Sequence, residues 1–312
     1  MAVAVFEPAY LSLRRTGELR ARAARALERM ADCDLCARAC HANRLDGVSG
    51  AVCRTGQRAR VHGHAPHFGE EAPLRGTRGS GTIFFSGCNL QCDFCQNWEI
   101  SRRGDGVEAA PEVLAQWMLE LQDEGCHNVN LVSPSHVVAQ VLAALEIAAG
   151  HGLEVPLVWN TGGYDSLEAL ALLHGVVDIY MPDMKYGDEK AARRHSHAPD
   201  YPRVNQAAVK EMHRQVGDLV LDETGIAVRG LLVRHLVLPN GLAGTEEVLA
   251  FLAREISANT YLNLMDQYHP ADRAPGIEPL SRRITRQEWN DGLDLAERYG
   301  LTRLDGRRRR PF

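Results

Sequence analysis

The chain has 312 residues, of which 45% are hydrophobic, so it can form one large domain or two ordinary ones. Its formal net charge of -5 excludes a global positive field that would attract nucleic acid or an anionic membrane. The sequence has no run of eighteen apolar residues and no signal-peptide pattern at its N-terminus, so we expect a cytoplasmic protein that binds neither nucleic acid nor membrane.

The first 80 residues are expected to form an N-terminal helix and a cysteine-rich, metal-binding segment. Residues 12–31 are rich in Arg, Ala, Leu and Glu at helical spacing, which predicts the helix. Residues 32–80 carry many Gly, Arg and His residues and few apolar runs, so this segment needs a metal or a packing partner to hold it. In the stretch HFGEEAP, Glu70 and Glu71 are expected either at the mouth of the following domain or beside the arginines of RGTR.

Four cysteines of this segment follow the spacing C-x2-C-x3-C-x12-C: Cys33, Cys36, Cys40 and Cys53. Clusters of cysteines in a long cytosolic chain point to metal ligation rather than to a disulfide framework. Four thiolates suit either a zinc ion or an auxiliary iron–sulfur cluster, and spacing alone does not separate the two. His41 beside Cys40 is an alternative ligand, and reduced thiols in a loop are the alternative to any metal.

Strands and helices alternate from about residue 81 to the C-terminus, and we expect residues 81–312 to form one domain. The expected strands are 82–87, 129–133, 155–159, 176–181, 231–238 and 260–265. Helical patterns lie between them and after the last one, with Pro and Gly at the joints. Six strand–helix units predict an α/β fold with parallel strands, a partial (β/α)6 barrel similar to a TIM barrel. Such a barrel carries its chemistry on the loops that leave the carboxyl ends of its strands.

The loop after the first of these strands contains Cys88, Cys92 and Cys95 in the spacing C-x3-C-x2-C. Three thiolates can hold three irons of a 4Fe–4S cluster, whereas electron-transfer clusters ordinarily take four. The fourth iron would then be free to bind a substrate, as catalytic zinc sites keep an open position. The alternative is a partial zinc site that takes its fourth ligand from elsewhere in the chain.

The stretch GCNLQCDFCQN resembles the signature of the radical S-adenosylmethionine (SAM) superfamily. Further stretches, among them NVNLVSPSH, WNTGGYDS, DIYMPDMKY and LNLMDQYHP, are similar to iron–sulfur proteins related to pyruvate formate-lyase activating enzyme. The resemblance covers residues 30–300 approximately. It implies a 4Fe–4S cluster held by Cys88, Cys92 and Cys95, which cleaves SAM to methionine and a 5′-deoxyadenosyl radical that abstracts hydrogen from a substrate.

The resemblance also implies roles for residues around the cluster. Phe94 would shield the cluster near the adenine, and Lys185 would bind the SAM carboxylate. Asp183 would hold the SAM amino group or a cation, although a buried salt bridge between Asp183 and Lys185 is the structural alternative. Further cofactor-binding candidates are Ser133, Ser135, Asn160, Arg234 and His235.

The sequence departs from the superfamily pattern at two of these places. Ser133-Pro134-Ser135 stands where a Gly-Gly-Glu usually meets the SAM amino group, and Asn160 replaces an acidic residue of the activating enzymes. The contacts to the SAM amino group are therefore expected to differ from those of the superfamily. His136 and Gln267 are the candidates for residues that face the substrate.

The resemblance implies an oxidoreductase that takes electrons from a donor such as flavodoxin or ferredoxin. One option for its substrate is a loop of a partner enzyme, activated by formation of a glycyl radical. The other option is a peptide or a small molecule. A rival from another class is a non-catalytic iron–sulfur or zinc protein, which would bind no SAM and would have four ligands at each site.

Overall fold

One sheet of nine strands forms the centre of the structure, a computed structural model that describes residues 6–306. The strands follow the order β3-β1-β2-β4-β5-β6-β8-β7, and β9 pairs with β8. Their bounds are β1 Ala59–His67, β2 Ser80–Phe85, β3 Val107–Ala109, β4 Val129–Val132, β5 Leu157–Thr161, β6 Ile179–Pro182, β7 Val220–Leu221, β8 Ala227–Leu236 and β9 Tyr261–Met265.

The pairs β2–β4, β4–β5, β5–β6, β6–β8 and β8–β9 are all parallel. These six strands correspond to the six expected from the sequence. β9 pairs with β8 but not with β2, so the sheet curves without closing. The structure therefore confirms the α/β fold and the partial (β/α)6 barrel. The strands β1, β3 and β7, which pair antiparallel, were not expected from the sequence.

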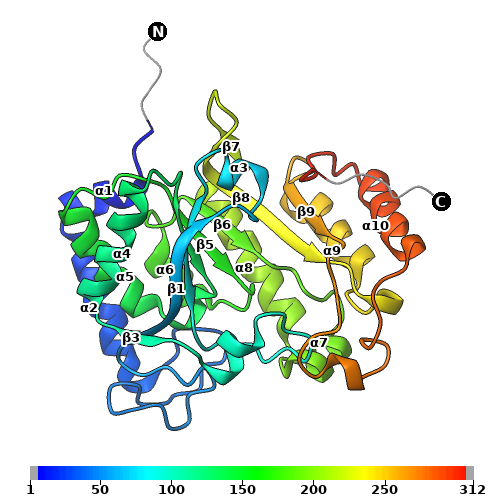
Figure 1. Cartoon of the computed structure of the whole chain (residues 1–312), viewed down its shortest axis with the longest axis horizontal. Helices are drawn as coiled ribbons and strands as arrows, with labels where there is room; N and C mark the ends of the chain where they lie inside the picture. The colour runs from blue at the N-terminus through cyan, green and yellow to red at the C-terminus, as the bar shows by residue number, and fades with distance from the viewer. Residues whose placement is uncertain (1–5, 307–312) are drawn as a thin grey trace.

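Helices cover the outside of the sheet (Figure 1). α1, α2, α4 and α5 lie together on one side of the molecule, and α9 and α10 lie on the other. Their bounds are α1 Ala9–Arg15, α2 Glu18–Glu28, α3 Ala72–Arg75, α4 Pro111–Asp123, α5 Val138–Gly150, α6 Leu167–Leu173, α7 Glu189–Ser196, α8 Tyr201–Val216, α9 Thr245–Phe251 and α10 Arg286–Arg298. The helix expected at 12–31 is two helices, because Gly17 adopts a left-handed conformation between them.

The central strands are buried on both faces, as parallel strands between helices are. Every residue of β5 is buried, and β2 is buried except at Phe84. Burial on both faces explains why these strands read as continuous apolar runs in the sequence. Within residues 6–306, no helix has both the length and the apolar character that crossing a membrane requires.

The segment before β1 has no regular structure between residues 33 and 58. β1 itself belongs to the barrel sheet, where it pairs with β2 across the domain boundary predicted at residue 80. The stretch between them spans the open side of the barrel. Asn263 of β9 donates a hydrogen bond to Glu71 at 2.6 Å, and the backbone of Ala72 donates one to Asp305.

Candidate active site

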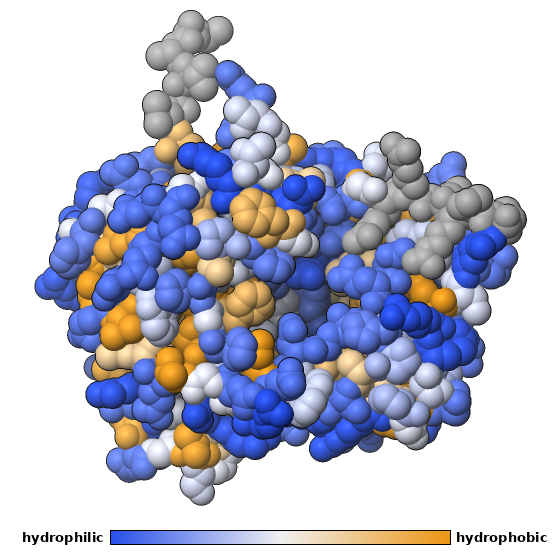
Figure 2. Space-filling view, in the orientation of Figure 1, coloured by the Kyte–Doolittle hydropathy of each residue, from blue (hydrophilic) through white to orange (hydrophobic). Residues whose placement is uncertain are grey.

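A cavity of about 200 Å³ lies at the carboxyl ends of the parallel strands. The face shown in Figure 2 is largely hydrophilic and is hollowed near its middle, between β1 and β8. The cavity is lined by Cys88, Leu90, Cys92, Phe94, Cys95, Gln96, Asn97, Ser101, Val132, Ser133, Asn160, Thr161, Gly162, Asp183, Met184, Lys185, Arg234, Leu236, Leu238, Met265 and Gln267. Residues from every parallel strand end therefore meet there, as expected for a barrel of this kind.

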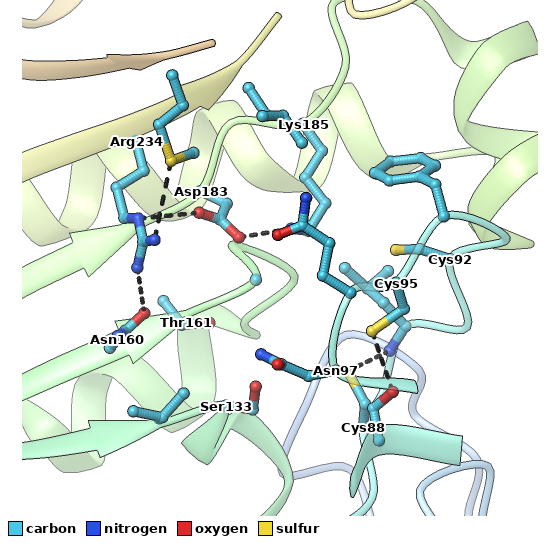
Figure 3. A pocket seen from close by; sticks show the side chains of 18 of the residues that line it. Cys88, Cys92, Cys95, Asn97, Ser133, Asn160, Thr161, Asp183, Lys185 and Arg234 are labelled. Carbon is cyan, nitrogen blue, oxygen red and sulfur yellow. Dashed lines mark hydrogen bonds and ion pairs between the residues drawn. The ribbon is translucent and has the colours of Figure 1, made fainter. Parts of the chain in front are cut away.

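Three thiols form one side of the cavity, on the loop that follows β2 (Figure 3). Each accepts or shares a hydrogen bond: Cys88 with the backbone N–H of Leu90, Cys92 with Ser196 at 3.0 Å, and Cys95 with Ser101 at 3.1 Å. Burial, together with the neighbouring Cys92, raises the pKa of the Cys88 thiol to about 12. Metal binding at this site must therefore displace protons from the thiols.

The opposite side of the cavity is charged (Figure 3). Lys185 Nζ donates to Asp183 Oδ2 at 2.5 Å, and Arg234 Nε lies 3.8 Å from Asp183 Oδ1. Burial disfavours the Lys185 ammonium, but the Asp183 carboxylate outweighs it and raises the pKa of Lys185. Lys185 is therefore a permanent cation between the carboxylate and the thiols.

Glu70 and Glu71 both lie behind the charged side of the cavity, next to Arg234. Glu71 Oε1 lies 3.3 Å from Arg234 Nε, and Glu70 Oε2 lies 4.0 Å from Arg234 Nη1. Of the two expected positions, the structure thus favours the barrel. Burial is also the main reason why the pKa of Glu70 is raised. Arg234 is held between these carboxylates and Asp183, although its Nε makes no hydrogen bond.

Three further residues of the expected cofactor site line the cavity. Phe94 is buried and packs edge-to-face against Tyr186 and Tyr268. Asn160 accepts a hydrogen bond from Arg234 at 3.4 Å. Ser133 has the left-handed backbone angles φ 59° and ψ 49°, which are uncommon outside glycine and often occur at functional sites.

Three other expected site residues do not line the cavity. Ser135 is buried and shares a hydrogen bond with Thr161 at 2.7 Å. His136, expected to face the substrate, is buried against the backbone oxygen of Ser86, so that expectation is wrong in this structure. His235 is buried between the Met184 carbonyl and Thr245. Burial lowers the pKa of both histidines to about 4, so each is neutral at physiological pH.

Sequence reasoning missed several residues that line the cavity. Thr161 and Met265 end their strands, like the residues that were identified, but their side chains carry no charge to draw attention. Asn97 and Gln96 lie just beyond the cysteine motif. The Gln96 amide donates to the Gln267 carbonyl at 3.3 Å, which links the cysteine loop to the loop after β9 across the open side of the barrel.

The four N-terminal cysteines are gathered in one segment. Cys33, Cys36 and Cys53 are buried, and Cys40 is half-buried against Ala42, Ala51 and Cys53. The exposed His41 is turned toward Asp32, with 2.9 Å between Nδ1 and Oδ1. Across residues 6–306, no three His, Cys, Asp or Glu side chains are close enough to hold a single metal ion.

The residues around the cavity fit a 4Fe–4S cluster and SAM by their chemistry. Cys88, Cys92 and Cys95 offer three soft sulfur donors that line the same cavity. Asp183, Lys185 and Arg234 offer both signs of charge for the amino and carboxylate groups of an amino acid. Arg234 Nε forms ion pairs with Glu71 and Asp183 but makes no hydrogen bond.

One family model and one curated relative match this chain. The family model of the radical SAM superfamily matches residues 82–216. The uncharacterized protein MJ0674 of Methanocaldococcus jannaschii is 32% identical over 278 residues, which cover 86% of this chain and 75% of that protein.

Two solved structures are similar at lower identity. A radical SAM methyltransferase from Sphaerobacter thermophilus aligns with a TM-score of 0.46 and 17% identity, over 71% of this chain and 64% of the methyltransferase chain. This chain thus spans just under two thirds of that protein. A structure of TYW1 with a lysine–pyruvate adduct bound aligns with a TM-score of 0.44 and 12% identity, over 71% of this chain and 73% of the other.

Proposed function

The chain belongs to the radical SAM superfamily, and we propose that it reductively cleaves SAM at the cavity to abstract hydrogen from a substrate. The superfamily implies a 4Fe–4S cluster and SAM as cofactors. One observation carries the proposal: Cys88, Cys92 and Cys95 face the charged group Asp183–Lys185–Arg234 across a single cavity. A protein that only stored or carried electrons would have no use for that charged group.

Each side of the cavity has a separate task in this proposal. Cys88, Cys92 and Cys95 would ligate the cluster, which when bound supplies the electron that splits SAM into methionine and a 5′-deoxyadenosyl radical. The Lys185 ammonium would bind the SAM carboxylate, and the Asp183 carboxylate would accept from its amino group. Arg234 holds Asp183 in place from behind, and Phe94 excludes water beside the cysteines.

Because Ser133-Pro134-Ser135 lacks the usual acidic residue, other side chains must contact the SAM amino group. Ser133 lines the cavity, whereas Ser135 is turned toward Thr161. We therefore assign the contact to Ser133 and Asp183, with Asn160 oriented by Arg234 in support. Gln267 lines the cavity and remains a candidate for substrate contact.

The substrate divides the proposal into two alternatives. Activation of a partner enzyme through a glycyl radical, as in pyruvate formate-lyase activating enzymes, requires a protein loop to enter the cavity. A peptide or a small molecule is the second alternative. In either case we propose flavodoxin or ferredoxin as the electron donor and the cytoplasm as the compartment.

We also propose a second metal centre at Cys33, Cys36, Cys40 and Cys53, either zinc or an auxiliary iron–sulfur cluster. Its support is the chemistry of the donor set, four thiols within 21 residues.

A binding measurement tests the proposed SAM site. Lys185→Met should weaken SAM binding to the anaerobically reconstituted protein by about thirtyfold, because the carboxylate of SAM then lacks its cationic partner. Asp183→Asn should weaken SAM binding for the complementary reason, the loss of the acceptor for the amino group. The exposed Lys190 provides a matched control, and Lys190→Met should bind SAM like the wild type. Unchanged SAM affinity in Lys185→Met, with the iron content intact, would refute the assignment.

A further inference from the structure

The buried guanidinium of Arg44 lies beside the N-terminal cysteines and has no carboxylate partner. Arg44 is 1% exposed. Its Nε donates to the Thr55 carbonyl at 2.7 Å, its Nη1 donates to Cys33 Sγ at 3.4 Å, and its Nη2 has no hydrogen-bond partner. Within residues 6–306, no Asp or Glu forms an ion pair with Arg44, and the one side chain among its hydrogen-bond partners is Cys33.

A buried charge without a counter-charge is strongly unfavourable, and arginine does not lose its proton in proteins. Neutral thiols would leave Arg44 in that situation. Cysteines bound to a metal are thiolates. Four thiolates exceed the charge of a zinc ion, and they likewise leave a four-cysteine iron–sulfur cluster negative overall. A metal at these cysteines would therefore supply the negative charge that Arg44 lacks.

We propose that Cys33, Cys36, Cys40 and Cys53 hold an anionic metal–thiolate centre whose counter-cation is Arg44. This inference rests on the second metal centre proposed above, and it adds the charge partner and a structural task. The backbone conformation around the cysteines also fits a segment that is held in place by a bound metal. Ala39, His41 and Arg54 all have positive φ, which non-glycine residues keep only where their surroundings enforce it.

The structural task is to hold the loop that carries the radical-cluster cysteines, residues 86–97, here called the cluster loop. Arg38, between Cys36 and Cys40, donates to the Asn89 carbonyl at 2.6 Å and to the Ser196 carbonyl at 3.1 Å. The Gln91 amide donates to the Val52 carbonyl at 3.4 Å. The two segments are also in close contact, because a Cβ at Gly87 would lie 2.5 Å from the Cys53 carbonyl oxygen. The metal centre thus braces the cluster loop.

The first test isolates the N-terminal site in the full chain. A variant with Cys88, Cys92 and Cys95 all changed to Ala is loaded anaerobically, in separate experiments, with Zn²⁺ and with Fe²⁺ plus sulfide. We expect either about one zinc or one iron–sulfur cluster of about four irons per chain, and the arm that binds identifies the metal. The further changes Cys33→Ala and Cys53→Ala should abolish this binding. No stoichiometric metal in either arm would overturn the inference.

The second test addresses Arg44 in the same triple-Ala background. Arg44→Gln should lower the metal affinity about tenfold or more in chelator competition, as loss of a residue that supports metal ligands does. Arg22→Gln, on α2 and paired with Glu18, should leave the affinity unchanged. Equal affinity in Arg44→Gln would overturn the role of Arg44. If that variant does not fold, Arg44→Lys keeps the charge: affinity within about threefold supports the role, and a tenfold loss contradicts it.

The third test addresses the brace. Amide hydrogen exchange in residues 86–97 of the triple-Ala variant should slow about tenfold or more when metal is added, because the loop is held by the N-terminal segment. Exchange that does not respond to the metal would overturn the bracing role. None of these readouts needs SAM or a reductant, so a failure of SAM cleavage and a failure of this inference remain distinguishable.

Discussion

The thiol of Cys92 accepts a hydrogen bond from Ser196, the last residue of α7, with 3.0 Å between Oγ and Sγ. The Ser196 hydroxyl is itself 2.8 Å from Tyr186 OH, and both side chains are buried. Hydrogen bonds to the sulfur ligands of an iron–sulfur cluster stabilise its more negative, reduced form. Ser196 therefore sets part of the reduction potential at which the proposed cluster works.

Ser196→Ala should lower the midpoint potential of the reconstituted cluster by on the order of 30 mV, since one hydrogen bond to a thiolate is lost. A redox titration followed by electron paramagnetic resonance measures this shift. Ser257→Ala removes a hydroxyl that bonds to Asp218, far along the chain from the cysteines, and should leave the potential unchanged. A potential equal to that of the wild type in Ser196→Ala, with the same iron content, would show that the bond does not tune the cluster.

At the scale of elements, Asp178 joins α1 to the barrel. Its carboxylate accepts from the backbone N–H of Ala9 at 2.9 Å, where α1 begins, and from that of Leu157 at 3.0 Å, where β5 begins. Burial raises the pKa of Asp178 to about 6, against the two backbone hydrogen bonds that lower it. The folded protein therefore holds a proton at pH values where the unfolded chain has released it.

This pKa shift predicts a pH dependence with a definite sign. The pKa of Asp178 is higher in the folded protein than in the unfolded chain, where it is near 4. Its contribution to the free energy of unfolding is therefore fully present below pH 4 and is lost as the pH rises to about 6. Asp178→Asn cannot titrate, so the stability of the wild type relative to this variant should fall by roughly 3 kcal/mol over that window and stay constant above it. Urea unfolding of both proteins from pH 3.5 to 7.5 measures the difference. A difference that is constant with pH would contradict the raised pKa.

Gly87 lies at the start of the cluster loop, just after β2, and has a φ of +83°. A Cβ there would lie 2.5 Å from the Cys53 carbonyl oxygen. Gly87→Ala should therefore cost about 2 kcal/mol or more of unfolding free energy, through backbone strain and a clash. Gly17→Ala is the matched control, since Gly17 has a similar φ of +77° and open space around it. If the two variants lose equal stability, the close contact between the segments does not matter.

The elements that the sequence predicted best were the buried parallel strands. Their apolar runs are continuous because both faces are covered, whereas β1 is buried only at Ala59 and Val61 and contains Gly63 and Pro66, which are poor strand formers. The position of the cysteine motif and of Asp183–Lys185 at the cavity could be predicted because the ends of the parallel strands meet there. His136 and His235 could not, because the direction of a side chain after a strand depends on local turns. Ser196 contacts a cysteine 104 residues away, and Arg44 contacts Cys33 and Thr55 within a segment that has no regular structure, so a single sequence reveals neither set of contacts.

At the scale of the whole molecule, the open side of the barrel is bridged by contacts between distant segments. Near the cavity, Arg102 pairs with Asp272, and the backbone of Arg273 donates to the Asp93 carbonyl. Behind the charged side of the cavity, the Asn263 amide donates to Glu71. These contacts hold the cluster loop, the charged strand ends and the last strand around one cavity. The proposed chemistry needs this arrangement.

The most direct test of the central claim is the formation of 5′-deoxyadenosine. Protein reconstituted anaerobically with iron and sulfide is mixed with SAM and dithionite, and the nucleoside is quantified by chromatography. We predict at least one equivalent of 5′-deoxyadenosine per chain, and none from Cys92→Ala. No 5′-deoxyadenosine from wild-type protein that carries its full cluster and binds SAM would contradict the account.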